Sequence, residues 1–151
     1  MDITAIASLI SVLVAIAAAW FSWISANAWK ESSIHAIRTK AMSDWIGMAA
    51  FFRGTLKPFD KRTLRWPEDK DAIEYVSEKY WSWVALWPSV KASLEDDLKK
   101  QATDLWDNSH EAYNSLMDGE CTVEQFALMV EAIYNSDLLE RVIKKHEKPT
   151  K

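Results

Sequence analysis

The first residues to consider for chemistry are side chains that could bind a divalent metal ion. They fall within 104–111, at a spacing that places them along one face of a helix. They are Asp104, Asp107, Asn108 and Glu111. A solvated acidic face is the commoner role for such a group, and nothing in the sequence brings ligands from a second helix. We therefore predict no metal site here.

A second acidic stretch, Asp118-Gly119-Glu120, could belong to a calcium-binding loop. Such a loop needs oxygen ligands at fixed positions. If Gly119 takes the sixth position of such a loop, Leu116 takes the third and Gln125 the twelfth. Two of the oxygen ligands that calcium requires are then missing. A plain turn between two helices explains these residues better.

Histidine and cysteine side chains show none of the spacings that metal or nucleophilic sites use. His35, His110 and His146 are scattered, and His110-Glu111 has no second histidine four residues later. Cys121 is the single cysteine, so it forms no intrachain disulfide. No glycine-rich phosphate loop or Gly-x-Ser-x-Gly elbow occurs. The sequence predicts no cofactor and no enzyme, and a membrane-tethered enzyme with an unfamiliar site remains as an alternative.

One segment concentrates positive charge beside aromatic side chains, as surfaces that contact lipid headgroups or nucleic acids do. Its basic residues are Arg53, Lys57, Lys61, Arg62 and Arg65. Phe59 and Trp66 lie among or next to them. Solvated charges are also normal in a polar loop between helices, so a contact with anions is the secondary interpretation. We expect no sequence-specific binding of nucleic acid.

These residues must be positioned by helices, and the first helix organises the chain. No charged residue occurs from Ile3 to Trp29. This stretch is longer than the roughly 20 apolar residues that cross a bilayer as a helix. We therefore assign residues 1–29 to a transmembrane helix. Tryptophan and lysine near its carboxyl end predict an interface with lipid headgroups. These anchor residues are Trp20, Trp23, Trp29 and Lys30.

Small residues in this span are spaced alternately by four and three positions, which keeps them on one side of a helix. They are Thr4, Ser8, Ser11, Ala15, Ala18, Ser22 and Ser25. Small side chains let two helix backbones approach closely in lipid, where no hydrophobic effect drives helices together. This stripe predicts an association surface as well as an anchor. In an alternative hypothesis, the same hydroxyl groups line a pore within a ring of helices.

Charge is distributed unevenly along the chain. Residues 30–70 carry nine lysines and arginines against five acidic residues, whereas residues 71–145 carry seven against fifteen. By the positive-inside rule, this predicts an amino terminus outside and a cytoplasmic helical domain at the inner, cytoplasmic membrane. A cleaved signal peptide is the competing interpretation. It is disfavoured because no lysine or arginine precedes the apolar stretch, which is also longer than such peptides use.

The rest of the chain has helical periodicity and only three glycines and four prolines, which leaves little material for β-turns. We predict an all-α protein, in which the transmembrane helix continues as a cytosolic stalk and a bundle of three to four helices follows. The expected boundaries are 30–54 for the stalk, 55–66 for a basic connecting loop, 67–146 for the bundle and 147–151 for a frayed tail. We expect Gly54 and Pro58 to end the stalk and Pro67 to open the next helix.

Nine tryptophans favour packing and protein contacts over any one chemistry. The sequence therefore predicts a single-pass membrane protein that functions in assembly and is embedded in membrane lipid. We expect it to self-associate, or to dock a partner membrane protein, through its span, its stalk and a tryptophan-rich helical domain. A membrane-active effector or small channel is the main alternative.

Overall fold

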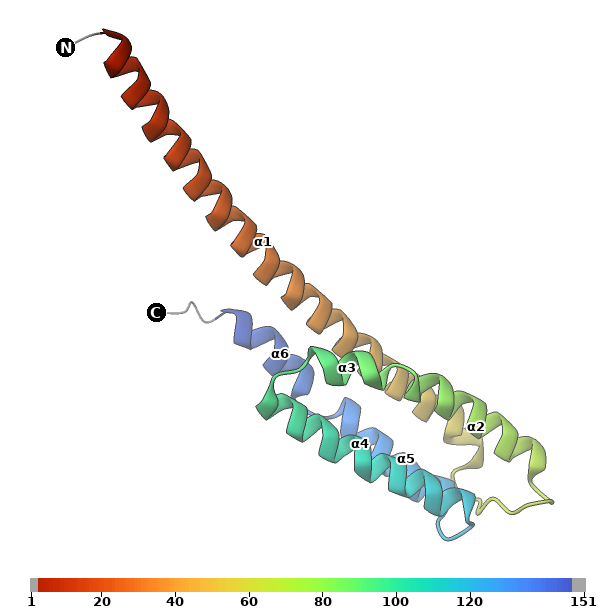
Figure 1. Ribbon diagram of the computed structural model, residues 1–151. Coiled ribbons are helices and arrows are strands. Elements are labelled where there is room, and N and C mark those ends of the chain that lie inside the picture. The colour runs from red at the N-terminus through yellow and green to blue at the C-terminus, as the bar shows by residue number, and fades with distance from the viewer. Residues whose placement is uncertain (1–2, 148–151) are drawn as a thin grey trace. The chain divides into compact units, whose positions relative to one another are not determined.

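The computed structural model describes the backbone of residues 3–147 and the side chains of residues 12–144. Its regular elements are all helical, and no β-strand occurs in the described chain (Figure 1). In order they are α1 (Ile3–Leu56), the short 3-10 helix η1 (Lys57–Phe59), α2 (Lys70–Val84), α3 (Trp87–Ser93), α4 (Asp96–Met117), α5 (Val123–Tyr134) and α6 (Leu138–Glu147). The all-α prediction is thereby confirmed.

The chain divides into two compact units, Met1–Ala36 and Ile37–Lys151. Within the described residues, the first unit contains only the amino-terminal part of α1. The second unit contains the rest of α1 together with the other helices, which pack around one hydrophobic core.

In the second unit, α1 is a helix of the bundle rather than a separate stalk. Its buried residues recur every three or four positions, and they are Met42, Trp45, Ala49, Phe52 and Leu56. The ring centroid of Phe52 lies 6.2 Å from that of Tyr80 on α2 and 5.7 Å from that of Phe126 on α5. Burying such large apolar side chains stabilises the fold, so helices of the same chain cover this face of α1. The expected stalk, 30–54, is therefore divided between the two units.

The helix ends near the basic segment differ from the prediction. Helix α1 continues through Gly54 to Leu56, and Pro58 lies in η1. The Trp66–Pro67 peptide bond is cis, residues 66–69 form turns, and α2 begins only at Lys70. The Asp69 carboxylate makes no capping bond to α2 and instead accepts a hydrogen bond from the backbone N–H of Arg65 at 3.0 Å.

The later helices follow local signals closely. Thr122 caps α5 in a capping box, with its backbone N–H donating to Oε1 of Gln125 at 2.8 Å. Gly119 adopts a φ of 72° directly after α4, in the left-handed region that favours glycine at helix ends. Helices α3 and α4 are separate, because the backbone is extended at Leu94 and Glu95.

Tryptophan side chains of the second unit mainly build its core. Trp45, Trp83 and Trp87 are buried there, whereas Trp66 and Trp81 are exposed. The expected tryptophan-rich docking surface is thus largely a tryptophan-rich interior.

Candidate membrane span and association surface

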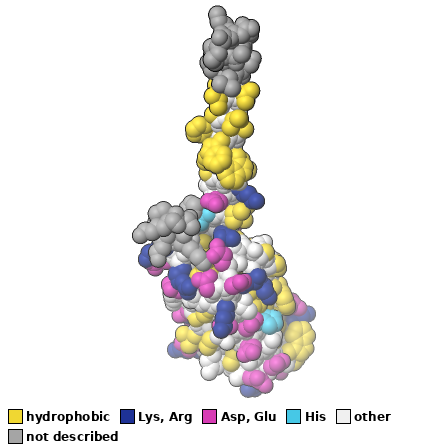
Figure 2. Space-filling model, turned by 60° about the vertical axis from the view of Figure 1, so that its left-hand side comes forward, with side chains coloured by type: hydrophobic (Ala, Val, Ile, Leu, Met, Phe, Trp, Pro, Cys, Tyr) yellow, Lys and Arg dark blue, Asp and Glu magenta, His cyan; other side chains and the backbone are white. Residues whose placement is uncertain are grey.

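Helix α1 is long and apolar enough to cross a membrane, with a mean hydropathy of 1.5, and it alone is so among the described residues. Every described side chain from Val12 to Ser32 is exposed. Figure 2 shows hydrophobic side chains covering the visible face of this part of α1. Water would solvate such a surface poorly, so its apolar side chains need an apolar environment.

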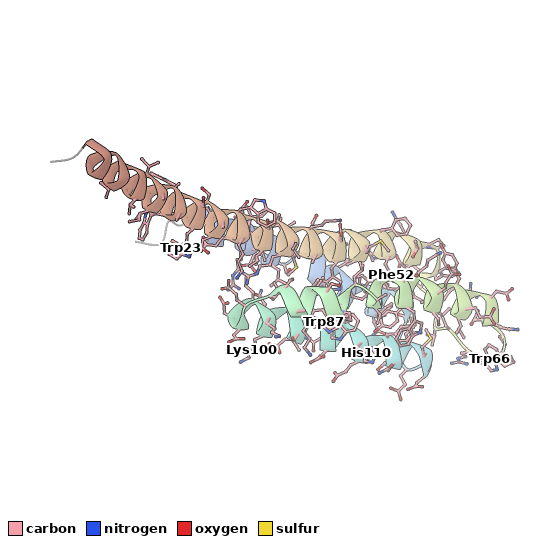
Figure 3. The ribbon with its side chains drawn as sticks, turned by 45° about the horizontal axis from the view of Figure 1, so that its top comes forward. Trp23, Phe52, Trp66, Trp87, Lys100 and His110 are labelled. Carbon is pink, nitrogen blue, oxygen red and sulfur yellow. The ribbon has the colours of Figure 1, made fainter. Side chains whose placement is uncertain are left out.

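The predicted interface anchors lie at the charged end of this apolar stretch. Trp20, Trp23 and Trp29 are all exposed, Trp29 at 74 %. The rings of Trp20 and Trp23 lie 5.7 Å apart between centroids, and Trp23 is marked on α1 in Figure 3. Lys30 follows directly and is exposed. Amphipathic indoles beside a lysine suit the depth of lipid headgroups.

Four residues of the predicted stripe have described side chains. Ala15, Ala18, Ser22 and Ser25 are all exposed. The side chains of Thr4, Ser8 and Ser11 lie outside the described residues. The stripe therefore stays a prediction about contacts with other molecules.

In the second unit, α1 presents a further set of small residues on the side opposite its buried one. They are Ser43, Gly47, Ala50 and Gly54, and we call them the small-residue face. All four are exposed and are spaced by four, three and four positions. A Cβ atom added at Gly47 or Gly54 would meet no heavy atom within 4 Å, and neither residue has a positive φ. The fold of this unit therefore gives no reason for a glycine at either position.

Gly47 and Gly54 are not among the helix-face residues that the sequence predicts, because Gly54 is expected to end the stalk. The alternating spacing from Ser43 to Gly54 was the signal that could have found them.

The five basic residues proposed to contact anions do not form one free patch. Nε of Arg53 donates to Oε1 of Glu131 on α5 at 2.5 Å, and another guanidinium nitrogen donates to Oδ1 of Asp60 at 2.8 Å. The hydrogen bond to Glu131 is the main reason that the pKa of Arg53 is raised. Arg62 is paired with Asp69, and its guanidinium group lies 5.7 Å from the ring centroid of Phe59.

The other three basic side chains, Lys57, Lys61 and Arg65, are exposed and form no ion pair within the described chain. An open cavity of about 550 Å³ adjoins this segment, lined by Phe59, Arg62 and residues 67–72. Its rim contains two cations and three carboxylates, so it does not select for a ligand of either charge.

Groups with metal-binding potential are not brought together. Among the described residues, no cluster of three or more histidine, cysteine, aspartate or glutamate side chains could hold a metal ion. Asp104, Asp107, Asn108 and Glu111 are exposed on α4. Burial raises the pKa of the Cys121 thiol, which favours its unreactive protonated form. Tyr80 and His110, which the sequence did not connect, share a hydrogen bond.

The described residues thus combine an exposed apolar helix, two sets of small side chains on that helix and a closely packed aromatic core. No family model matches this chain, and neither a curated protein nor a solved structure does.

Proposed function

We propose that this protein is a single-pass protein of the inner, cytoplasmic membrane that associates with copies of itself through α1. The observation that carries the proposal is the small-residue face of α1, where Gly47 and Gly54 lack any neighbour within the chain that would require a glycine. The exposed apolar surface that starts at Val12 supports insertion of the same helix into lipid.

The cost of these glycines supports association. Glycine in the interior of an exposed helix is less favourable than alanine by about 1 kcal/mol. Neither Gly47 nor Gly54 recovers this free energy through a turn or a close contact inside the chain. A missing Cβ becomes favourable when a second helix packs against the position, because the two backbones can then approach closely.

The partner in this proposal is a second copy. Copies that insert into one membrane with the same orientation run parallel, so a two-fold interface brings each residue opposite its own equivalent. A seam of alanine, serine and glycine is self-complementary in that arrangement, since no large side chain meets another. Hydroxyl groups such as those of Ser22 and Ser25 add only about 0.6 kcal/mol each on average in membranes, so close packing supplies most of the free energy.

Orientation follows from charge. Lys30, Arg38 and Lys40 come directly after the span, which supports a cytoplasmic location for the bundle. A reporter fused after Lys151 should therefore be active in the cytoplasm. Activity outside the cytoplasmic membrane would contradict this orientation.

One experiment, which tests the stripe, compares two double variants of the full chain in lipid nanodiscs. Ala15→Leu with Ala18→Leu places bulk on the stripe, and Ala17→Leu with Ala19→Leu places the same bulk on other sides of the same helix. Energy transfer between labelled copies should show that the first pair raises the dissociation constant by about tenfold or more, which is about 1.4 kcal/mol. The second pair should change it little.

Equal effects of the two double variants would show that the stripe is not the interface. A monomeric native chain would contradict the proposal as a whole. The pore alternative predicts another pattern, in which Ser→Ala changes on the stripe alter ion conductance while assembly stays intact.

A further inference from the structure

The last described helix, α6, packs on the bundle with few buried side chains (Figure 1). Of its described side chains, which end at Lys144, only Leu138 and Val142 are buried. Helix α5 buries five, and its Phe126 contacts aromatic rings of α1, α2 and α4. No aromatic residue occurs from Leu138 to Lys144. Burial of apolar surface therefore stabilises the position of α6 less than that of α5.

A polar clamp, formed by Asp97, Gln101, Asp137 and Arg141, joins the start of α6 to α4. Nε2 of Gln101 donates to Oδ1 of Asp137 at 3.0 Å, and Oε1 of Gln101 accepts a hydrogen bond from Arg141. A second guanidinium nitrogen of Arg141 lies 3.6 Å from Oδ2 of Asp97. The side chains of these two charged partners are 40 % and 57 % exposed. Water and salt screen such a pair, so the polar clamp holds α6 only weakly.

Helix α5 ends on hydrogen bonds that do not involve α6. The backbone N–H of Asn135 donates to the carbonyl oxygen of Glu131 at 3.0 Å, and the backbone N–H of Ser136 donates to that of Ile133 at 3.2 Å. The Ser136 hydroxyl group donates to the same oxygen of Ile133 at 2.6 Å. Asp137 then separates these hydrogen bonds from α6. A backbone rotation at Asp137 can therefore move α6 while the carbonyl groups at the end of α5 stay paired.

We propose that α6 is a strap that opens and closes on α4 while the helices from α1 to α5 stay folded. In the open form, Leu138 and Val142 leave the core and the polar clamp is broken. The part of the core that these two side chains cover then becomes accessible to water, and the strap controls this access. Segments with few buried apolar contacts and exposed polar contacts open at a smaller free energy than the whole domain.

Two matched buried valines test the proposal in the full chain in nanodiscs. Cys121 is first replaced with serine, and Val142→Cys on α6 is then compared with Val130→Cys on α5. Both valines are buried, so a water-soluble thiol reagent modifies either cysteine only when its position opens. After correction for the rate in the unfolded chain, Val142→Cys should react at least about tenfold faster than Val130→Cys.

The dependence of these rates on urea identifies the kind of opening. At low urea concentration the rate for Val142→Cys should change little, because opening of α6 exposes little surface. The rate for Val130→Cys should rise steeply, because the whole bundle must unfold there. Hydrogen exchange of the native chain gives the same comparison without any substitution, and amides of α6 should exchange faster than those of α5.

A further pair of variants tests the polar clamp. Arg141→Gln removes the ion pair to Asp97, so it should raise the rate for Val142→Cys by about two- to fivefold, the range for a partly exposed ion pair. Glu140→Gln is the matched control, since Glu140 pairs with Lys144 inside α6, and it should change the rate by less than about twofold. Neither change should alter the rate for Val130→Cys.

Far-UV circular dichroism and urea unfolding establish that each variant keeps the bundle. Equal rates for the two cysteines, with the same dependence on urea, would show that α6 opens only when the whole bundle unfolds, and this would overturn the proposal. An unchanged rate in Arg141→Gln would overturn the role of the polar clamp.

Discussion

The indole nitrogen of Trp83 on α2 donates a hydrogen bond to the backbone carbonyl oxygen of Trp45 on α1 at 3.1 Å, and the two rings stack with centroids 5.9 Å apart. Both side chains are fully buried. The indole N–H of Trp45 has no hydrogen-bond partner among the described atoms. A paired N–H contributes about 0.5–1.5 kcal/mol, whereas a buried unpaired one costs about 1–3 kcal/mol. The two members of this stacked pair therefore contribute differently to stability.

Replacing Trp83 with Phe should lower the free energy of unfolding by about 1–2 kcal/mol more than replacing Trp45 with Phe. Both changes remove the same group from one core, so the cost of the cavity is similar in the two variants. Only Trp83→Phe breaks a hydrogen bond, and Trp45→Phe removes an unpaired donor. Urea unfolding followed by far-UV circular dichroism measures the difference. Equal losses would show that the bond from Trp83 adds nothing.

Arg53 connects three parts of the bundle, because it lies on α1 and pairs with Glu131 on α5 and with Asp60 after η1. Its side chain is 19 % exposed, so Arg53→Met leaves two carboxylates partly buried without their partner. We expect a loss of about 1–3 kcal/mol in the free energy of unfolding. Lys57→Met is the matched control, since Lys57 is exposed and forms no ion pair in the described chain, and it should change stability by less than about 0.5 kcal/mol. Similar losses of unfolding free energy in Arg53→Met and Lys57→Met would show that the ion pairs of Arg53 do not stabilise the bundle.

The helices were predictable where their signals are local. The capping box at Thr122 and the left-handed glycine at Gly119 each involve residues close together in sequence, so local pattern is enough to locate the start of α5 and the end of α4. The partners of Arg53 were not predictable in this way. Glu131 lies 78 positions away, and only the packing of α1 against α5 brings the two together. Two members of the basic cluster, Arg53 and Arg62, thus form ion pairs within the chain.

The role of α1 shows the same limit. Periodicity can locate apolar positions such as Trp45 and Phe52, but it does not state whether the surface that covers them belongs to the same chain or to another. The core of the second unit answers this for the buried side of α1. The small residues on the exposed side were not predicted, because a glycine near a proline usually marks a helix end. Helix α1 nevertheless continues through Gly54.

Tyr80 should make stability depend on alkaline pH. Burial, and secondarily Tyr113, raises the pKa of Tyr80 in the folded state above the ordinary value of 10.0. The unfolded chain therefore releases this proton first, so the contribution is fully present below pH 10 and is lost as the pH rises further. Each pH unit should remove about 1.4 kcal/mol until the folded tyrosine also ionises. Urea unfolding at several pH values above 10 should give a steeper loss for the native chain than for Tyr80→Phe, and parallel losses would contradict the expected shift.

The glycines of the small-residue face allow stability and association to be separated. Gly47→Ala and Gly54→Ala should each raise the free energy of unfolding by up to about 1 kcal/mol, because alanine favours the helix and the added Cβ meets open space. Gly47→Leu and Gly54→Leu should leave the bundle equally well folded, since the larger side chains also project away from its core. If copies pack through this face, the leucines should instead hold two helices apart.

Energy transfer between labelled full-length chains in nanodiscs then distinguishes the outcomes. The double leucine variant should raise the dissociation constant by about tenfold or more, whereas Ala92→Leu with Ala132→Leu, at exposed positions on α3 and α5, should change it little. The double alanine variant should fall between the native chain and the leucine variant, because one methyl group separates the backbones less than an isobutyl group does. Unchanged association in the leucine variant, with the fold intact, would exclude this face as the interface and leave the exposed glycines without a role in assembly.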